Sequence, residues 1–170
     1  MILFHGSCKK FNKIDLNECK QGSDFGQGFY LTHDKSTAKN WMIQLYSKGI
    51  SKSMNVGRYL YSFDIDISEL KKEFTYKLFT VSAEYFYYII CNRNGLPCLN
   101  YDIIEGPIAD NRLKYILDRY QSMHNNGLVT DRKLFDLAKE ATKLTPFNQI
   151  CIKNQKIIDK LNRCLQRSDL

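Results

Sequence analysis

Strand-like and helix-like spacings of apolar residues follow one another along this chain in an irregular order. In residues 59–66, tyrosine, phenylalanine and isoleucine occupy every second position, which is typical of a half-buried strand. In residues 35–47 the apolar residues recur at helical spacing, and Asp34 is expected to cap that helix. Because the sequence lacks a regular strand–helix–strand repeat, we predict an α+β fold.

The same two spacings of apolar residues, alternating for strands and helical for helices, predict the other elements. Further strands are expected at residues 2–5, 25–32, 101–105 and 149–153, and further helices at 82–92, 111–123 and 131–144. A C-terminal helix is expected to bury Ile157, Ile158, Leu161, Cys164 and Leu165, and the helix at 35–47 to bury Ala38, Trp41, Met42, Leu45 and Tyr46. Residues 8–23 and 49–57 are expected to be loops, and residues 68–80 fit neither pattern clearly.

Length and composition indicate one globular domain spanning residues 1–170. Hydrophobic residues make up 44% and charged residues 25% of the chain, which excludes wholesale disorder. No apolar run approaches the roughly 20 residues of a membrane helix. The first residues lack a basic leader followed by a long apolar stretch, so we expect a cytoplasmic protein, although an effector delivered without a signal would look the same.

Charge and cysteine content add two expectations about partners. The formal net charge of +7 is spread along the chain, which fits a solvated lysine-rich surface or attraction of an anionic nucleotide or nucleic acid. The six cysteines form no C-x-x-C pair, and no histidine lies at zinc-finger spacing from them. We therefore expect reduced thiols and no metal site.

Three short segments carry the candidate chemistry. His5-Gly6-Ser7 ends the first expected strand, where a ring nitrogen and backbone groups can reach one ligand. Residues 24–32 read DFGQGFYLT, and Trp41 follows Tyr30 by eleven positions, so two aromatic faces can enclose a planar group; both rings can equally belong to the core. Gln149 starts a late apolar strand, where it points into a cleft or into water.

Taken together, these segments resemble the ADP-ribosyltransferase fold. The similarity is to the histidine–tyrosine–glutamate branch, which contains the poly-ADP-ribose polymerases and diphtheria-type toxins. The chain is more similar still to a group of small bacterial proteins of unassigned function that share HGS, DFGxGFYLT and DxxEGPxAD, the last here at residues 102–110. This resemblance implies split antiparallel sheets flanked by helices, with NAD as substrate and no metal.

The resemblance also implies a role for each matching residue. His5 would bind the adenosine-side ribose, the backbone of Gly6 would hold the nicotinamide amide, and Ser7 would support that contact. Tyr30 would stack on nicotinamide and Trp41 would cover its other face. Gly28 would let the backbone approach the ligand closely.

The third family position departs from the pattern. Where the branch uses glutamate to hold the nicotinamide ribose and polarise the acceptor, this chain has Gln149, which can hydrogen-bond but cannot act as a general base. Glu105 and Asp110 are alternative carboxylates; Glu105 can also be a surface residue at a strand end, and Asp110 can also cap the helix that Asn111 opens.

The resemblance therefore implies an NAD-dependent mono-ADP-ribosyltransferase that modifies an unknown protein or nucleic acid and releases nicotinamide, with weak NAD hydrolysis as a side activity. Single transfer is favoured over chain elongation because the glutamate is missing. A degenerate NAD- or ADP-ribose-binding module is the alternative. An NAD-dependent RNA 2′-phosphotransferase ranks lower, since neither N-terminal motif contains the arginines on which that branch relies.

Overall fold

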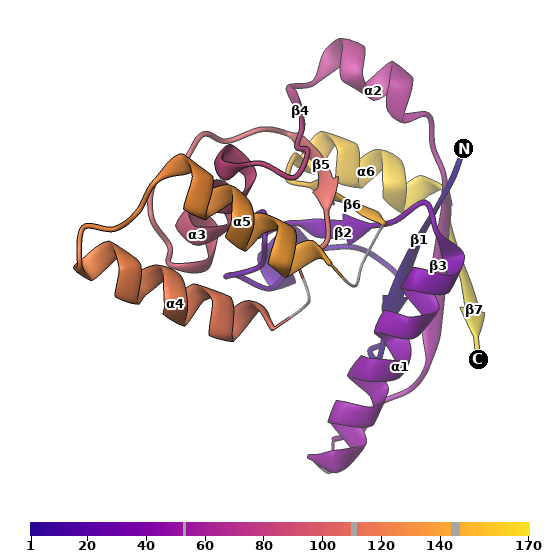
Figure 1. Cartoon of the computed structure of the whole chain (residues 1–170). Coiled ribbons are helices and arrows are strands. Elements are labelled where there is room, and N and C mark those ends of the chain that lie inside the picture. The colour runs from indigo at the N-terminus through magenta and orange to yellow at the C-terminus, as the bar shows by residue number, and fades with distance from the viewer. Residues whose placement is uncertain (53, 110–111, 144–146) are drawn as a thin grey trace.

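The strands form two separate sheets, seen in a computed structural model that describes residues 1–52, 54–109, 112–143 and 147–170 (Figure 1). The first sheet has the order β1–β3–β7, and all its pairs are antiparallel. The second has the order β2–β6–β5–β4, in which only β4 and β5 run parallel. The strands are β1 (Ile2–Ser7), β2 (Phe29–Leu31), β3 (Tyr59–Asp64), β4 (Tyr76–Leu78), β5 (Ile103–Pro107), β6 (Asn148–Ile152) and β7 (Leu165–Asp169).

One isolated bridge joins the two sheets. Phe4 N donates to Thr32 O at 2.8 Å, and Thr32 N donates to Phe4 O at 2.9 Å. This bridge connects β1 with the residue that follows β2. The α+β fold with split, mainly antiparallel sheets is thus confirmed, with β4–β5 as a parallel pair.

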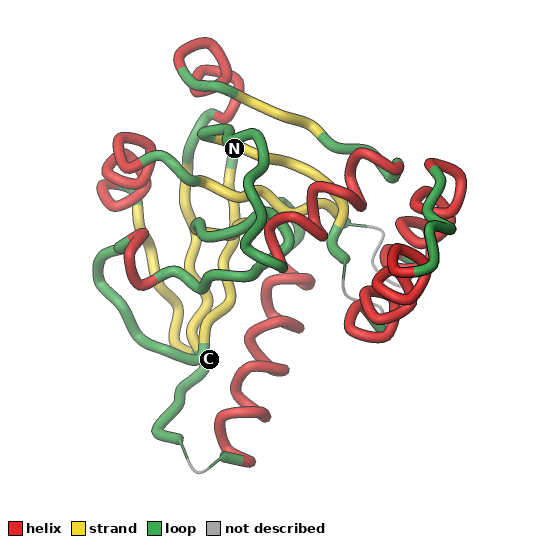
Figure 2. Tube along the Cα trace, turned by 90° about the vertical axis from the view of Figure 1, so that its left-hand side faces the viewer, coloured by secondary structure: helices red, strands yellow, loops and turns green. Residues whose placement is uncertain are grey.

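The helices flank these sheets. They are α1 (Lys35–Ser51), α2 (Ile67–Glu73), α3 (Ala83–Arg93), α4 (Leu113–Asn125), α5 (Asp131–Thr142) and α6 (Gln155–Arg163), with a short 3₁₀ turn at Leu16–Glu18. Asp34 caps α1 as predicted, because its carboxylate accepts from Thr37 N at 2.5 Å. In Figures 1 and 2 the C-terminal end of α1 extends past the rest of the fold.

The four-stranded sheet separates two hydrophobic clusters. One cluster contains Ile104 and Cys151 together with side chains of α3, α4 and α5, and Tyr30 packs against it. The other contains Phe29, Leu31, Ile150 and Ile152 together with side chains of α6 and the three-stranded sheet. Because successive residues of a strand point to opposite faces, β2, β5 and β6 each contribute to both clusters.

Several sequence-based boundaries are corrected by the structure. The predicted C-terminal helix ends at Arg163, and Leu165 begins β7 opposite Phe63 of β3. Only Phe29–Leu31 of the predicted 25–32 strand is extended, since Gly26 turns the chain with a φ of +83°. Residues 68–80, whose sequence fits neither the strand nor the helix pattern clearly, contain most of α2 and all of β4. The predicted helix residues Asn111 and Leu144 lie outside the described residues.

Candidate functional site

The gap between β1 and β2 brings two predicted site residues face to face. Beyond the Phe4–Thr32 bridge, antiparallel register sets Gly6 opposite Tyr30. All residues of β1 lie opposite a residue of β3, but the backbone hydrogen bonds fall on the odd-numbered ones, in register with the bond from Ile65 N to Met1 O (3.1 Å). The N–H and C=O of Gly6 therefore point away from β3, toward Tyr30.

The backbone of Gly6 has unused hydrogen-bonding capacity in this gap. Gly6 is buried, and neither its N–H nor its C=O has a partner in the part of the chain that the structure describes. Helix α1 lies directly on it, so a Cβ at this position would overlap the Ala38 carbonyl oxygen and meet the Met42 side chain. Position 6 thus requires glycine for close packing, and the unpaired groups form a donor–acceptor pair for a ligand.

The imidazole of His5 bridges the two sheets at the same point. Its Nδ1 lies 2.7 Å from Tyr30 O, and because a carbonyl oxygen only accepts, Nδ1 carries the proton. Burial lowers the pKa of His5 to about 4, against the raising effect of the Tyr30 bond, so the ring is neutral at pH 7. The ring stacks on Phe29 at 4.5 Å between centroids. Its Nε2 is then a hydrogen-bond acceptor, which suits a ligand hydroxyl.

The Tyr30 hydroxyl already makes two hydrogen bonds within the protein. The hydroxyl donates to Gly26 O at 2.8 Å and accepts from Phe25 N at 3.0 Å. Burial, followed by the nearby Cys151 and Asp24, raises the pKa of Tyr30 far above its ordinary value, which keeps the phenol neutral. Tyr30 therefore contributes an aromatic ring, packed against the cluster of α3, α4 and α5, rather than an acid or base.

The exposure of Trp41 contradicts the prediction that this residue lies on the buried side of its helix. Its side chain is 47% exposed, although Ala38 and Met42, three residues before and one after, are buried against Gly6. Among the described residues Trp41 makes no ring contact with Tyr30, whose ring pairs with Phe25 instead. The structure thus brings an exposed indole onto the helix that covers Gly6, without forming the predicted aromatic sandwich.

Gln149 lies on the same face of the second sheet as Tyr30. Tyr30 is opposite Cys151 in the β2–β6 pair, and Gln149 is two residues before Cys151. Its Nε2 donates to Asp24 Oδ2 at 2.8 Å and to Pro107 O at 3.2 Å. Both partners are acceptors, which fixes the amide orientation. The side-chain oxygen of Gln149 is left without a partner among the described residues.

Asp24 connects this glutamine to the rest of the fold, and the sequence analysis assigned it no role. It is 5% exposed and accepts bonds from Arg93 Nε (3.2 Å), Arg93 Nη2, Ala109 N (3.2 Å) and the Gln149 amide. The sequence holds no local signal of this role, because Asp24 follows Ser23 at the start of the DFGQGFYLT segment and Arg93 lies between Asn92 and Asn94, so neither charge stands in an apolar stretch.

Glu105 points to the opposite face of the sheet from Gln149. It pairs with Ile150, whose side chain belongs to the other hydrophobic cluster. Its carboxylate accepts from the Tyr76 hydroxyl at 2.8 Å and lies 3.7 Å from Lys71 Nζ. Glu105 therefore does not share the Tyr30 face. Asp110, the other alternative carboxylate, lies outside the described residues.

The two remaining predicted residues have local structural roles. Ser7 Oγ accepts from Lys9 N at 3.0 Å, which holds the end of β1. A Cβ at Gly28 would overlap Cys151 Sγ and meet Ile152 O at 2.9 Å. Gly28 thus allows β2 to pack directly against β6. The room beside this glycine is filled by β6 and is not space for a ligand.

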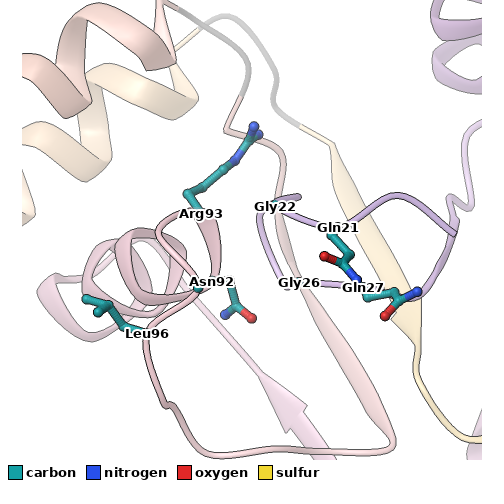
Figure 3. A pocket seen from close by; sticks show the side chains of 8 residues that line it. Gln21, Gly22, Gly26, Gln27, Asn92, Arg93 and Leu96 are labelled. Atoms are coloured by element: carbon teal, nitrogen blue, oxygen red, sulfur yellow. The ribbon is translucent and has the colours of Figure 1, made fainter.

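An open depression of about 570 Å³ lies beside the Asp24–Arg93 pair (Figure 3). Arg93 and Asn92 of α3 form one wall, and the loop with Gly22 and Gly26 forms the other. Its lining contains neither Gly6 nor Tyr30, so this depression is separate from the gap between β1 and β2.

In residues 1–52, 54–109, 112–143 and 147–170, no three histidine, cysteine or acidic side chains gather closely enough to hold a metal ion. Over the same ranges, no helix combines the length and apolar character needed to cross a membrane.

Comparison with known proteins assigns the chain to a family. A family model described as "Protein of unknown function (DUF3990)" matches residues 1–163. Because the match covers nearly the whole chain, the chain belongs to this family. No curated protein and no solved structure gives a significant match.

Proposed function

We propose that this chain is an NAD-dependent mono-ADP-ribosyltransferase, which moves ADP-ribose from NAD to a macromolecular acceptor and releases nicotinamide. The observation that carries the proposal is the position of Gly6 across the gap from Tyr30, set by the register of the Phe4–Thr32 bridge, with His5 bonded to the Tyr30 carbonyl. These residues match the motifs in which the sequence resembles ADP-ribosyltransferases.

Nicotinamide binding would use the unpaired backbone of Gly6. A carboxamide has one donor and one acceptor side, which complements the N–H and C=O of Gly6. The Tyr30 ring would cover one face of the pyridine, and Trp41, exposed in the free protein, would cover the other. His5 Nε2 would accept from a hydroxyl of the adenosine ribose, the role consistent with its neutral state.

In the proposed reaction the bond between the nicotinamide nitrogen and the ribose breaks first. Its electron pair stays on nicotinamide, and an oxocarbenium-like ribose remains. The Gln149 side-chain oxygen would accept from a ribose hydroxyl and so place partial negative charge near the developing cation. The acceptor then attacks the ribose carbon and loses its proton to solvent. We propose a single transfer, because Gln149 cannot serve as a general base.

The first experiment measures nicotinamide release and incorporation of label from NAD labelled in the ADP-ribose part. Wild-type protein should release nicotinamide and label itself or an added protein or nucleic acid. His5→Ala and Tyr30→Ala should lose both signals, while the exposed His124 changed to Ala should keep them. Equal activity in wild type and both site variants would contradict the site, and no activity in wild type would contradict the enzyme.

A second candidate is an NAD- or ADP-ribose-binding module without transfer, and the neutral Gln149 favours it. Calorimetry separates the two candidates. Binding of NAD with no nicotinamide released over hours supports the module. An RNA 2′-phosphotransferase is less favoured; RNA binding that does not weaken as salt rises would dismiss it, because phosphate contacts release counterions. We place the activity in the cytosol, of the producing cell or of a cell that receives the protein.

A further inference from the structure

We propose that Asp24 is the positioning residue for Gln149. It holds the glutamine amide with its oxygen toward the reacting ribose and supplies the negative charge that a glutamate would otherwise bring. This inference rests on the proposed function for its catalytic consequence, while the positioning itself can be tested without NAD.

The contact geometry determines which way the amide points. Asp24 Oδ2 and Pro107 O both face Gln149 Nε2, at 2.8 and 3.2 Å. If the amide rotated by half a turn, its oxygen would lie against two acceptors, which is repulsive. The only stable orientation therefore directs the oxygen away from Asp24, and Gln149 presents an acceptor alone, as a carboxylate would.

The charge on Asp24 has two effects on the glutamine. At 5% exposure its carboxylate lies in a poorly solvated site, where a hydrogen bond to an ionised acceptor is stronger than one between neutral groups. Donation of the amide N–H to this carboxylate also increases electron density on the amide oxygen. Arg93 makes two bonds to Asp24 Oδ1, which leaves Oδ2 for Gln149 and Ala109 N.

The arrangement also fixes Gln149 relative to several distant segments. Asp24 begins the DFGQGFYLT segment, Arg93 ends α3, and Ala109 follows β5. A change at Asp24 would therefore release the glutamine, although the hydrogen bonds that Asp24 makes to described residues go to Arg93, Ala109 and Gln149. Asn at position 24 can accept from Gln149 or from Arg93 with its one oxygen, but not satisfy both sets of donors.

The positioning is tested by NMR of ¹⁵N-labelled protein without ligand. The Gln149 side-chain NH₂ signal, assigned by its loss in Gln149→Met, should exchange slowly with water in wild type and quickly in Asp24→Asn. The exposed Gln44 serves as the fast reference. A Gln149 signal that exchanges as fast as that of Gln44 in wild type would overturn the inference.

The catalytic consequence is tested by a double-mutant cycle on nicotinamide release. Asp24→Asn should lower kcat about tenfold to a hundredfold, as expected when a reacting group is misplaced, with a much smaller change in KM for NAD. In the Gln149→Met background the same Asp24→Asn change should have almost no further effect on kcat. Equal losses in both backgrounds would mean that Asp24 does not act through Gln149.

The matched control is Asp102→Asn. Asp102 also connects distant segments, through Thr75 and Asn154, but it contacts none of the site residues. Its kcat should match wild type, and melting temperatures of all variants report folding. If Gln149 is protected but wild type neither binds nor cleaves NAD, the proposed function fails and the positioning stands. If NAD is cleaved and Gln149 is unprotected, the positioning fails and the proposed function stands.

Discussion

His5 Nδ1 donates to the carbonyl oxygen of Tyr30 at 2.7 Å, and this bond lies where β1 and β2 separate. In a continuous sheet the backbone of Gly6 would take the place of this ring. The imidazole therefore supplies the hydrogen bond that the Tyr30 carbonyl of the second sheet needs. The N–H and C=O of Gly6 stay available for a ligand. A side chain thus creates an opening in the backbone pairing without leaving the Tyr30 carbonyl unsatisfied.

The stability of the fold should depend on pH through His5. Because its folded-state pKa is lowered to about 4, the unfolded chain binds the proton more readily between about pH 6.5 and pH 4. The free energy of unfolding should therefore fall as pH is lowered through this window. Urea titrations of wild type and His5→Gln at pH 7 and pH 5 check this; an equal pH dependence in both would contradict it.

Replacing Gly6 with alanine should destabilise the protein by about 1–3 kcal/mol, the usual cost of overpacking. The added methyl group would overlap the Ala38 carbonyl oxygen, and helix α1 would have to move. Thermal unfolding measures the effect. Ser7→Ala is the neighbouring control, because within the described part of the chain Ser7 Oγ accepts from Lys9 N alone, and the melting temperature of this variant should stay near that of wild type.

Trp41 should report ligand binding through its fluorescence. It is the only tryptophan and is 47% exposed, so acrylamide should quench its emission readily in the free protein. Saturating NAD should reduce that quenching, because the indole would then stack on the pyridine ring. Binding of NAD measured by calorimetry with unchanged quenching would remove Trp41 from the binding site.

Glu105→Gln should leave nicotinamide release unchanged. Glu105 faces the cluster that contains Ile150, on the side of the sheet away from Tyr30. The substitution should instead lower the pKa of Tyr76, which burial and then the bond to Glu105 raise above its ordinary value. Ultraviolet titration of the tyrosines checks the second effect. A loss of turnover in Glu105→Gln would assign the third catalytic position to this carboxylate.

Several elements could be predicted from the sequence because they depend on local spacing, whereas α2, β4 and β7 were not. The cap at Asp34 and the strand at residues 59–64 follow from near neighbours in the chain. The error at the C-terminus has a clear cause. Leu165 continues the helical spacing of α6, yet pairing with Phe63 of β3 extends the chain, and pairing between distant segments is not visible in a local pattern.

The candidate site was only partly predictable for the same reason. His5, Gly6 and Tyr30 lie in short motifs, and the structure brings them together at the gap between the sheets. Asp24 and Arg93 are 69 positions apart, and neither carries a local signal of pairing with the other. Trp41 follows the spacing of buried residues, but the buried residues of α1 are Ala38, Met42 and Gly49, and the indole is 47% exposed.

The two hydrogen bonds of the Tyr30 hydroxyl bear on affinity as well as on geometry. They anchor the far end of the side chain to Gly26 and Phe25, so the orientation of the ring is set when the protein folds. A flat molecule that settles on this ring does not have to immobilise it. Ordering a side chain at an interface normally costs about 0.5–1.5 kcal/mol of binding free energy, and Tyr30 does not add this cost when a ligand binds.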